Sequence, residues 1–180
     1  TKVILREQCT TLELIIKSSE SRALWHRLKA DERVVNLVEV LILRASDWMI
    51  ELDTVFPNLH SAYIYYRHRI TAAELSCFSH LRRLKLVGCR DLDPAPLANV
   101  QELSLNSCKV EFVRGLEQLR TLRIENCKNL RAVETLLNLQ TLHLSSCQSL
   151  IQIVDLPRAH YVDITLCHSL GCINGLDSIH

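Results

Sequence analysis

Cysteine is the residue type in this sequence whose spacing most suggests chemistry. Five of the eight cysteines recur at intervals of 19, 19, 20 and 20 residues: Cys89, Cys108, Cys127, Cys147 and Cys167. Thiols can pair as disulfides, and "CHSLGC" places Cys167, His168 and Cys172 close together, as a zinc site would require. However, no second ligand pair follows at zinc spacing, and a regular period accounts for the thiols without pairing. We therefore expect no metal and no cofactor, and we predict that the five periodic cysteines are structural.

Histidine, aspartate and serine form a second group of interest. When the cysteine-bearing copies are aligned, His143 and Asp163 occupy equivalent positions, and Ser145 follows two residues after His143. The set superficially mimics a serine-hydrolase relay. In an extended strand, however, Ser145 would lie about 7 Å from His143, and a flat sheet offers no oxyanion hole. We therefore predict that the chain is not an enzyme and has no catalytic residue.

Each periodic cysteine ends the same pattern, Φ-x-x-Φ-x-Φ-x-x-Cys, where Φ is apolar. The five copies are "LRRLKLVGC", "VQELSLNSC", "LRTLRIENC", "LQTLHLSSC" and "AHYVDITLC". Alternate residues of a strand point to the same face, so the two apolar residues of Φ-x-Φ are buried together. Each copy should contribute one short strand, stacked in parallel about 4.8 Å from the next. At the turn, a small thiol can fill tight space and donate weakly to a backbone carbonyl.

The pattern resembles the leucine-rich-repeat family in its cysteine-bearing short form, LxxLxLxxC, from Leu81 to Leu176. The resemblance implies an α/β fold: a right-handed solenoid with a parallel β-sheet on its concave face. We expect short helices in the N-terminal third. On the convex side of the C-terminal repeats we expect mostly turns or 3₁₀ segments, because apolar residues there recur every third position, as at Leu130, Val133 and Leu136.

The period divides one continuous domain into three parts. Residues 1–36 should form a strand ("LELIIK") and a helix ("SESRALWHRLKAD") that cap the solenoid or form a degenerate repeat. Residues 37–80 hold longer, 22-residue repeats, with short helices at "DWMIELDTVF" and "TAAELSCF". Their first copy reads Leu37-x-x-Val40-x-Ile42, with a register that is ambiguous by one residue. Residues 81–180 hold the regular repeats, and both ends of the chain look truncated.

The outward strand positions supply the candidate partner-binding residues. Exposed aromatic side chains beside arginine are typical of interaction hot spots, as in "YIYYRHR". The predicted contact residues are Tyr63, Tyr65, Tyr66, Arg67, Arg83, Lys85, Arg123, His143 and Tyr161. With Arg69, Arg82 and Arg90, the cations form a local positive excess. Two alternatives stay open: the tyrosines are covered by the chain itself, or Arg82 and Arg90 point away and the patch dissolves into a solvated face.

We predict a protein–protein interaction module that presents a rigid concave surface to a partner protein or peptide. The alternatives are an RNA-contacting surface built on the Tyr/Arg patch and the recognition arm of a larger enzyme or receptor. A net charge of +1 argues against a generally polyanion-binding surface. No apolar run approaches the roughly 20 residues of a membrane-spanning helix, so we expect no membrane partner. Cysteines kept reduced favour an intracellular compartment, cytoplasmic or nuclear.

Overall fold

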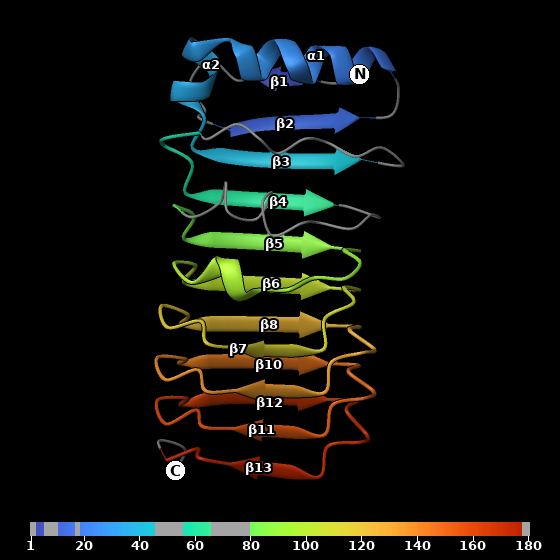
Figure 1. Cartoon of the computed structure of the whole chain (residues 1–180), viewed down its shortest axis with the longest axis vertical. Coiled ribbons are helices and arrows are strands. Elements are labelled where there is room, and N and C mark those ends of the chain that lie inside the picture. Colours follow the sequence, from blue (N-terminus) through green and yellow to red (C-terminus); the bar gives the residue numbers. More distant parts are fainter. Residues whose placement is uncertain (1–2, 6–10, 17–18, 46–55, 66–79, 178–180) are drawn as a thin grey trace.

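The computed structural model describes residues 3–5, 11–16, 19–45, 56–65 and 80–177. Over these residues the chain is a parallel-strand β-solenoid with few helices, and its coils stack along one axis (Figure 1). The solenoid predicted from the period is confirmed. The helices expected at 47–56 and 71–78 lie outside the described residues, apart from Phe56.

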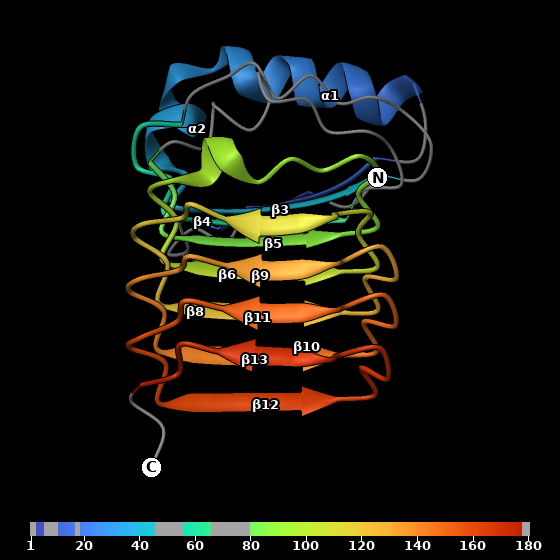
Figure 2. The same ribbon diagram turned by 60° about the horizontal axis from the view of Figure 1, so that its bottom comes forward.

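Two sheets form the two sides of the solenoid (Figure 2). The nine strands of the larger sheet, in spatial order, are β1 (Val3–Leu5), β2 (Thr11–Ile16), β3 (Val40–Ala45), β4 (Ser61–Tyr65), β5 (Arg83–Val87), β6 (Glu102–Asn106), β8 (Thr121–Glu125), β10 (Thr141–Ser145) and β12 (Tyr161–Thr165). The four strands of the smaller sheet are β7 (Phe112–Arg114), β9 (Ala132–Glu134), β11 (Gln152–Val154) and β13 (Cys172–Asn174). All neighbours pair in parallel except β1, which pairs antiparallel with β2.

The larger sheet forms because each copy buries the same two side chains. Leu103 pairs in register with Leu122, and Leu122 with Leu142, and all three are buried. Each strand therefore extends a buried column that its neighbours have already begun. Full burial of a leucine side chain stabilises a fold by about 1.5 to 3 kcal/mol, so the repeated pattern fixes the register.

The opposite side of the C-terminal coils differs from the expectation of turns and 3₁₀ segments. Short parallel strands form the second sheet there, and the described residues contain one 3₁₀ helix, Ala95–Leu97. That helix lies in the coil before β7, where Pro94 and Pro96 have no N–H to offer a strand ladder. The later coils lack these prolines and extend the ladder, with Val133 and Ile153 buried in register.

The register predicted at 37–42 was wrong by one residue. The pattern there runs Val38-x-x-Leu41-x-Leu43, because Leu41 and Leu43 are fully buried and pair with Ala62 and Ile64. Leu41 and Leu43 therefore face the core and not the outward side, where the register Leu37-x-x-Val40-x-Ile42 would place them. Ile42 occupies that face instead, beside Tyr63, and Arg44 lies beside Tyr65.

Two helices lie at the N-terminal end of the stack, α1 (Ser19–Ala30) and α2 (Glu32–Leu37) (Figures 1 and 2). Trp25 of α1 is buried, and its ring centroid lies 6.1 Å from that of Phe56. The Asp31 side chain caps α2 by accepting a 3.0 Å hydrogen bond from the Arg33 N–H. The strand and the helix predicted for residues 1–36 thus both exist, as β2 and α1, and α2 is an element that sequence patterning missed.

Left-handed backbone turns recur at two points of each coil. One set comes directly before the cysteines: Gly88, Ser107, Asn126, Ser146 and Leu166 all have positive φ. The other set follows the strands of the smaller sheet: Gly115, Thr135, Asp155 and Gly175. L-residues pay about 1 to 2 kcal/mol for this conformation, and a β-branched residue such as Thr135, at φ 52°, is among the least suited.

We expect Thr135→Gly to raise the free energy of unfolding by about 1 kcal/mol, since glycine adopts positive φ without strain. Gly115 already occupies the equivalent turn of the preceding coil. The measurement is chemical denaturation followed by circular dichroism. Thr141→Gly, which removes a threonine from the first position of β10, is the matched control and should lower stability. A denaturation midpoint for Thr135→Gly at or below that of the parent chain would contradict the strain assigned to this turn.

Candidate functional site

The candidate site lies on the open face, defined here as the outward side chains of strands β2 to β12 in the larger sheet. Parallel pairing aligns these side chains in columns across the strands. Tyr63 lies between Ile42 and Lys85, and Arg83 lies between Ser61 and Glu102. Neighbouring chemistry on this face is therefore set by residues about twenty positions apart in sequence.

A shallow depression of about 210 Å³ gathers four of the predicted contact residues. Tyr63, Arg83, Lys85 and Arg123 surround it, and the buried leucines Leu84 and Leu103 also line it. The tyrosine is half-buried, and both arginines are exposed. The structure thus brings an aromatic ring and three cationic side chains to one place on a rigid sheet.

The other predicted residues do not join this depression. Tyr65 lies two residues after Tyr63 on β4, at the next outward position. The Arg44 guanidinium carbon lies 4.4 Å from its ring centroid. His143 and Tyr161 form a separate group on β10 and β12, the strands that follow β8, with ring centroids 5.0 Å apart. Tyr66 and Arg67 lie outside the described residues, as does Arg69.

The cationic patch expected around residues 65–90 is divided among different places. Arg82 lines a depression beside His60 and His80, before the strands begin. Arg90 lines another beside Gly88 and Ser107, after the strands end. Of the described cations in that range, Arg83 and Lys85 remain together on the open face.

Ion pairs occupy several charges of the open face. Arg123 Nε lies 2.6 Å from Glu125 Oε1, and Arg44 Nε lies 3.3 Å from Glu13 Oε1. The hydrogen bond from Arg123 holds the pKa of the Glu125 carboxyl below its ordinary value. The Asn106 amide also donates to this carboxylate, at 2.8 Å. The Glu125 carboxylate is therefore ionised and already accepts hydrogen bonds from Arg123 and Asn106.

A buried serine fixes one of the exposed cations. Ser61 is 1% exposed, and its Oγ accepts a 2.9 Å hydrogen bond from Arg83 Nε. His60 Nδ1 lies 2.9 Å from the same Oγ. Arginine can only donate, so the serine oxygen accepts from Arg83, and the histidine tautomer sets whether the serine hydroxyl donates to His60 Nδ1 or accepts from it. This arrangement was missed in the sequence; the available signal was a serine in the column position next to Arg83.

The serine-hydrolase arrangement considered from the sequence is not assembled. His143 Nδ1 lies 3.3 Å from Asp163 Oδ2, so these two side chains do meet. Within the part of the chain that the structure describes, Ser145 makes no hydrogen bond to His143. Nor do the described residues contain a group of three His, Cys, Asp or Glu side chains able to hold a metal ion.

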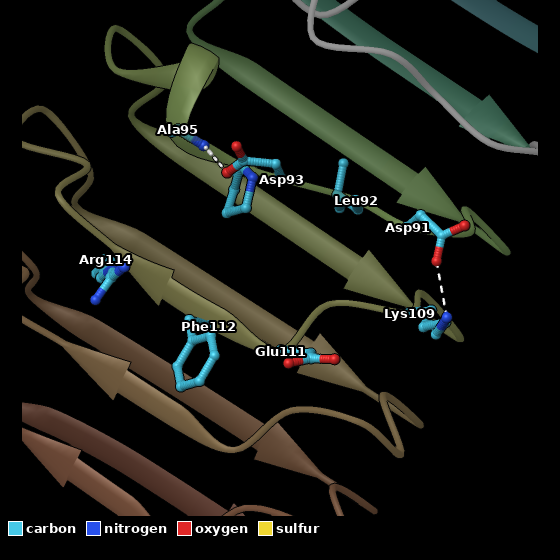
Figure 3. A pocket seen from close by; sticks show the side chains of 9 residues that line it. Asp91, Leu92, Asp93, Ala95, Lys109, Glu111, Phe112 and Arg114 are labelled. Carbon is cyan, nitrogen blue, oxygen red and sulfur yellow. Dashed lines mark hydrogen bonds and ion pairs between the residues drawn. The ribbon is translucent and has the colours of Figure 1, made fainter.

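A larger depression, of about 380 Å³, lies beside β7 on the other side of the solenoid (Figure 3). Its charges are largely matched internally. Lys109 Nζ lies 2.8 Å from Asp91 Oδ1, and Asp93 Oδ1 accepts from the Ala95 N–H. Arg114 lies over the ring of Phe112, 5.7 Å from its centroid. This hollow is more voluminous than the one on the open face, and within the described residues its Glu111 and Arg114 make no ion pair.

The periodic cysteines form one internal file beneath the ends of the larger sheet's strands. Cys89, Cys108, Cys127 and Cys147 are buried, and Cys167, in the last described coil, is half-buried. Cys108 Sγ donates to the Leu86 carbonyl at 3.5 Å, in the preceding coil, and Cys127 Sγ donates to the Leu105 carbonyl at 3.9 Å. Cys108, Cys127 and Cys147 therefore fill their turns and link their coils to the ones before them, whereas Cys167 donates to Thr165 of its own coil.

Burial also sets the protonation state of the file. It raises the pKa of Cys147 to about 11. The adjacent thiol of Cys108, together with burial, raises the pKa of Cys127. Cys127 and Cys147 stay neutral near pH 7, as a structural role requires, whereas hydrogen bonds from the thiols of Cys127 and Cys89 lower the pKa of Cys108.

Compared with known proteins, the sequence matches no protein-family model, and no curated protein matches it. Among the described residues, no helix is long and apolar enough to cross a bilayer.

We expect Cys127→Ser to lower the free energy of unfolding by about 1 to 3 kcal/mol, since it places a more polar hydroxyl in the buried file. Cys172→Ser is the matched control, because Cys172 is half-buried and outside the file. Its sulfur accepts from the Asn174 amide, a role that a serine oxygen can take over. Equal denaturation midpoints for the two variants would contradict the structural role of the file.

We expect stability to fall as pH rises from about 9 to about 11, in part through Cys147. The folded-state pKa of Cys147 is about 11, against an ordinary value of 9.0, so above pH 9 the unfolded chain releases this proton more readily than the folded one. The stabilisation is complete below the unfolded pKa and is lost as pH rises through the folded pKa. Urea denaturation at stepped pH measures it. Cys147→Ala should flatten this alkaline slope, and an unchanged slope would exclude the contribution.

Proposed function

We propose that the chain is a leucine-rich-repeat module that binds another protein or peptide through its open face. The observation that carries the proposal is the depression where Tyr63, Arg83, Lys85 and Arg123 surround two buried leucines. Aromatic rings and arginines gathered at one place on a surface are typical of binding hot spots. No catalytic role is needed for these residues.

The regular sheet supports the same proposal through its rigidity. Tyr63 and Lys85 project from paired strands whose flanking residues, Ala62, Ile64, Leu84 and Leu86, are all buried. A surface held in this way loses little conformational entropy when it binds, so more of the contact energy contributes to affinity.

The compartment is part of the proposal. Six cysteines within the described residues are free thiols, and four of them are buried. Proteins with unpaired structural thiols are typical of reducing compartments. We place the binding function inside the cell, in the cytoplasm or nucleus.

We expect the double variant Tyr63→Ala, Tyr65→Ala to lose captured partners while it still unfolds cooperatively. Both rings are half-buried on the open face, so their removal takes away contact area without opening the core. The measurement is affinity capture from native lysate with mass spectrometry, with and without nuclease. Phe112→Ala, which removes a 40% exposed ring from the opposite sheet, is the matched control and should keep the partners.

Two outcomes would contradict the proposal. One is recovery of the same partners with the double variant as with the parent chain. The other is loss of all partners after nuclease treatment, which would assign the open face to RNA instead.

A further inference from the structure

We propose that the depression on the open face takes an acidic side chain of the partner peptide, a carboxylate or a phosphate. Arg83 and Lys85 would bind the anion, and Ser61 would act as the positioning residue for Arg83. This inference rests on the proposed function, because it names the chemistry of the partner segment that the same face would recognise.

The pairing of charges on the open face favours this ligand. Its described strands carry four cations, Arg44, Arg83, Lys85 and Arg123, and four acids, Glu13, Glu102, Glu125 and Asp163. Arg44 and Arg123 are paired with Glu13 and Glu125, and Asp163 contacts His143. Within the described residues, Lys85 makes no hydrogen bond, and Arg83 uses only its Nε. Lys85 acts on the Glu125 carboxyl through its charge alone, so it and Arg83, which share one face of β5, are the two cations with donors left for a ligand.

The buried Ser61 gives Arg83 a defined orientation. Its oxygen occupies Arg83 Nε at 2.9 Å and is itself held by His60, whose Nε2 lies 3.8 Å from Glu39 Oε2. The two terminal nitrogens of the guanidinium remain available for a bidentate contact with a carboxylate or phosphate. A guanidinium fixed in advance loses less side-chain entropy on binding than a free one.

The size and lining of the depression fit one side chain. At about 210 Å³ it is smaller than the roughly 300 to 1,000 Å³ of pockets that enclose small-molecule ligands. Leu84 and Leu103 lie beneath it and are only 2% and 1% exposed, so contact with the apolar part of the incoming side chain comes from the aliphatic stems of Arg83 and Lys85 and from the Tyr63 ring. An anionic end group would then reach Arg83 and Lys85.

Glu102 provides a test of whether the depression prefers an anionic or a cationic side chain. It pairs in register with Arg83, lines the same depression and makes no ion pair within the described residues. Its carboxylate opposes an incoming anion and would attract an incoming cation. A long polyanion such as RNA would also meet Glu125 and Asp163, so a short acidic segment suits the face better than a run of phosphates.

The test uses the full chain, immobilised, and peptide libraries with randomised flanks and one fixed central residue. The fixed residue is glutamate, phosphotyrosine, glutamine or lysine, and a labelled single-stranded RNA is a separate probe. We expect the glutamate or phosphotyrosine pool to be retained about fivefold to tenfold more than the glutamine pool, the range for one charge-assisted contact. Which of the two leads distinguishes a carboxylate ligand from a phosphate ligand.

Five variants make the assignment specific. Arg83→Gln should abolish the anionic preference, and Glu102→Gln should increase it. Arg114→Gln, an exposed arginine on the smaller sheet, should leave it unchanged. Ser61→Ala should reduce retention of the anionic pools without changing that of the glutamine pool, and Ser61→Thr should restore it. Loss of stability alone would lower all pools together, so the ratio between pools separates positioning from folding.

The outcomes distinguish this inference from the proposed function. Equal retention of the glutamate, phosphotyrosine and glutamine pools, or preference for the lysine pool, would overturn the anion site. In that case the proposed function would stand if the tyrosine double variant still lost its captured partners. Tighter RNA binding that Arg83→Gln removes would overturn both.

Discussion

The fold depends on one constraint: every coil must bury the same side chains at the same height as the coil before it. Leu103, Leu122 and Leu142 meet in one column, and the thiols of Cys108 and Cys127 donate to carbonyls of the preceding coil. A coil alone cannot bury its apolar pair, so stability comes from the interfaces between neighbours. The N-terminal coil satisfies the constraint differently, through α1 and the packing of Trp25 against Phe56.

The same constraint leaves the open face free to vary. Outward positions alternate with buried ones, so a residue such as Lys85 can change without disturbing Leu84 or Leu86. Parallel pairing also places Ser61, Arg83 and Glu102 side by side although they are distant in sequence. The outward residues of neighbouring coils together determine what the face can bind, whereas the buried residues of each coil determine stability through their contacts with the next coil.

The sequence pattern predicted the strands that precede the periodic cysteines, but it missed the second sheet and the register of β3. The Φ-x-x-Φ-x-Φ-x-x-Cys period located strands β5, β6, β8, β10 and β12 and the thiol file, because these positions are fixed by burial alone. The strand at 40–45 was read one residue out of register, since Val40, Leu41, Ile42 and Leu43 are all apolar and offer two equally good alternations. The second sheet was missed because an apolar residue at every third position suits a 3₁₀ turn as well as a short strand; Pro94 and Pro96 decide between them in one coil only.

The candidate site was predicted in part. Its residues Tyr63, Arg83, Lys85 and Arg123 could be assigned to one face from the sequence. The Ser61–Arg83 hydrogen bond could not, since it depends on side-chain conformations that no period specifies.

Pairing of charges, more than their number, decides what the open face can recognise. Its cations and acids balance, so its net field is weak and long-range attraction of a polyanion is small. Arg123 is held by Glu125, and this exposed pair adds little to stability, but it removes one cation from competition for a ligand. Ser61 does the opposite for Arg83: as a neutral acceptor it holds the guanidinium without neutralising it. A buried hydroxyl can therefore orient a charge that an acidic partner would have cancelled, and this difference separates Arg83 from Arg44 and Arg123, the other arginines of the same face.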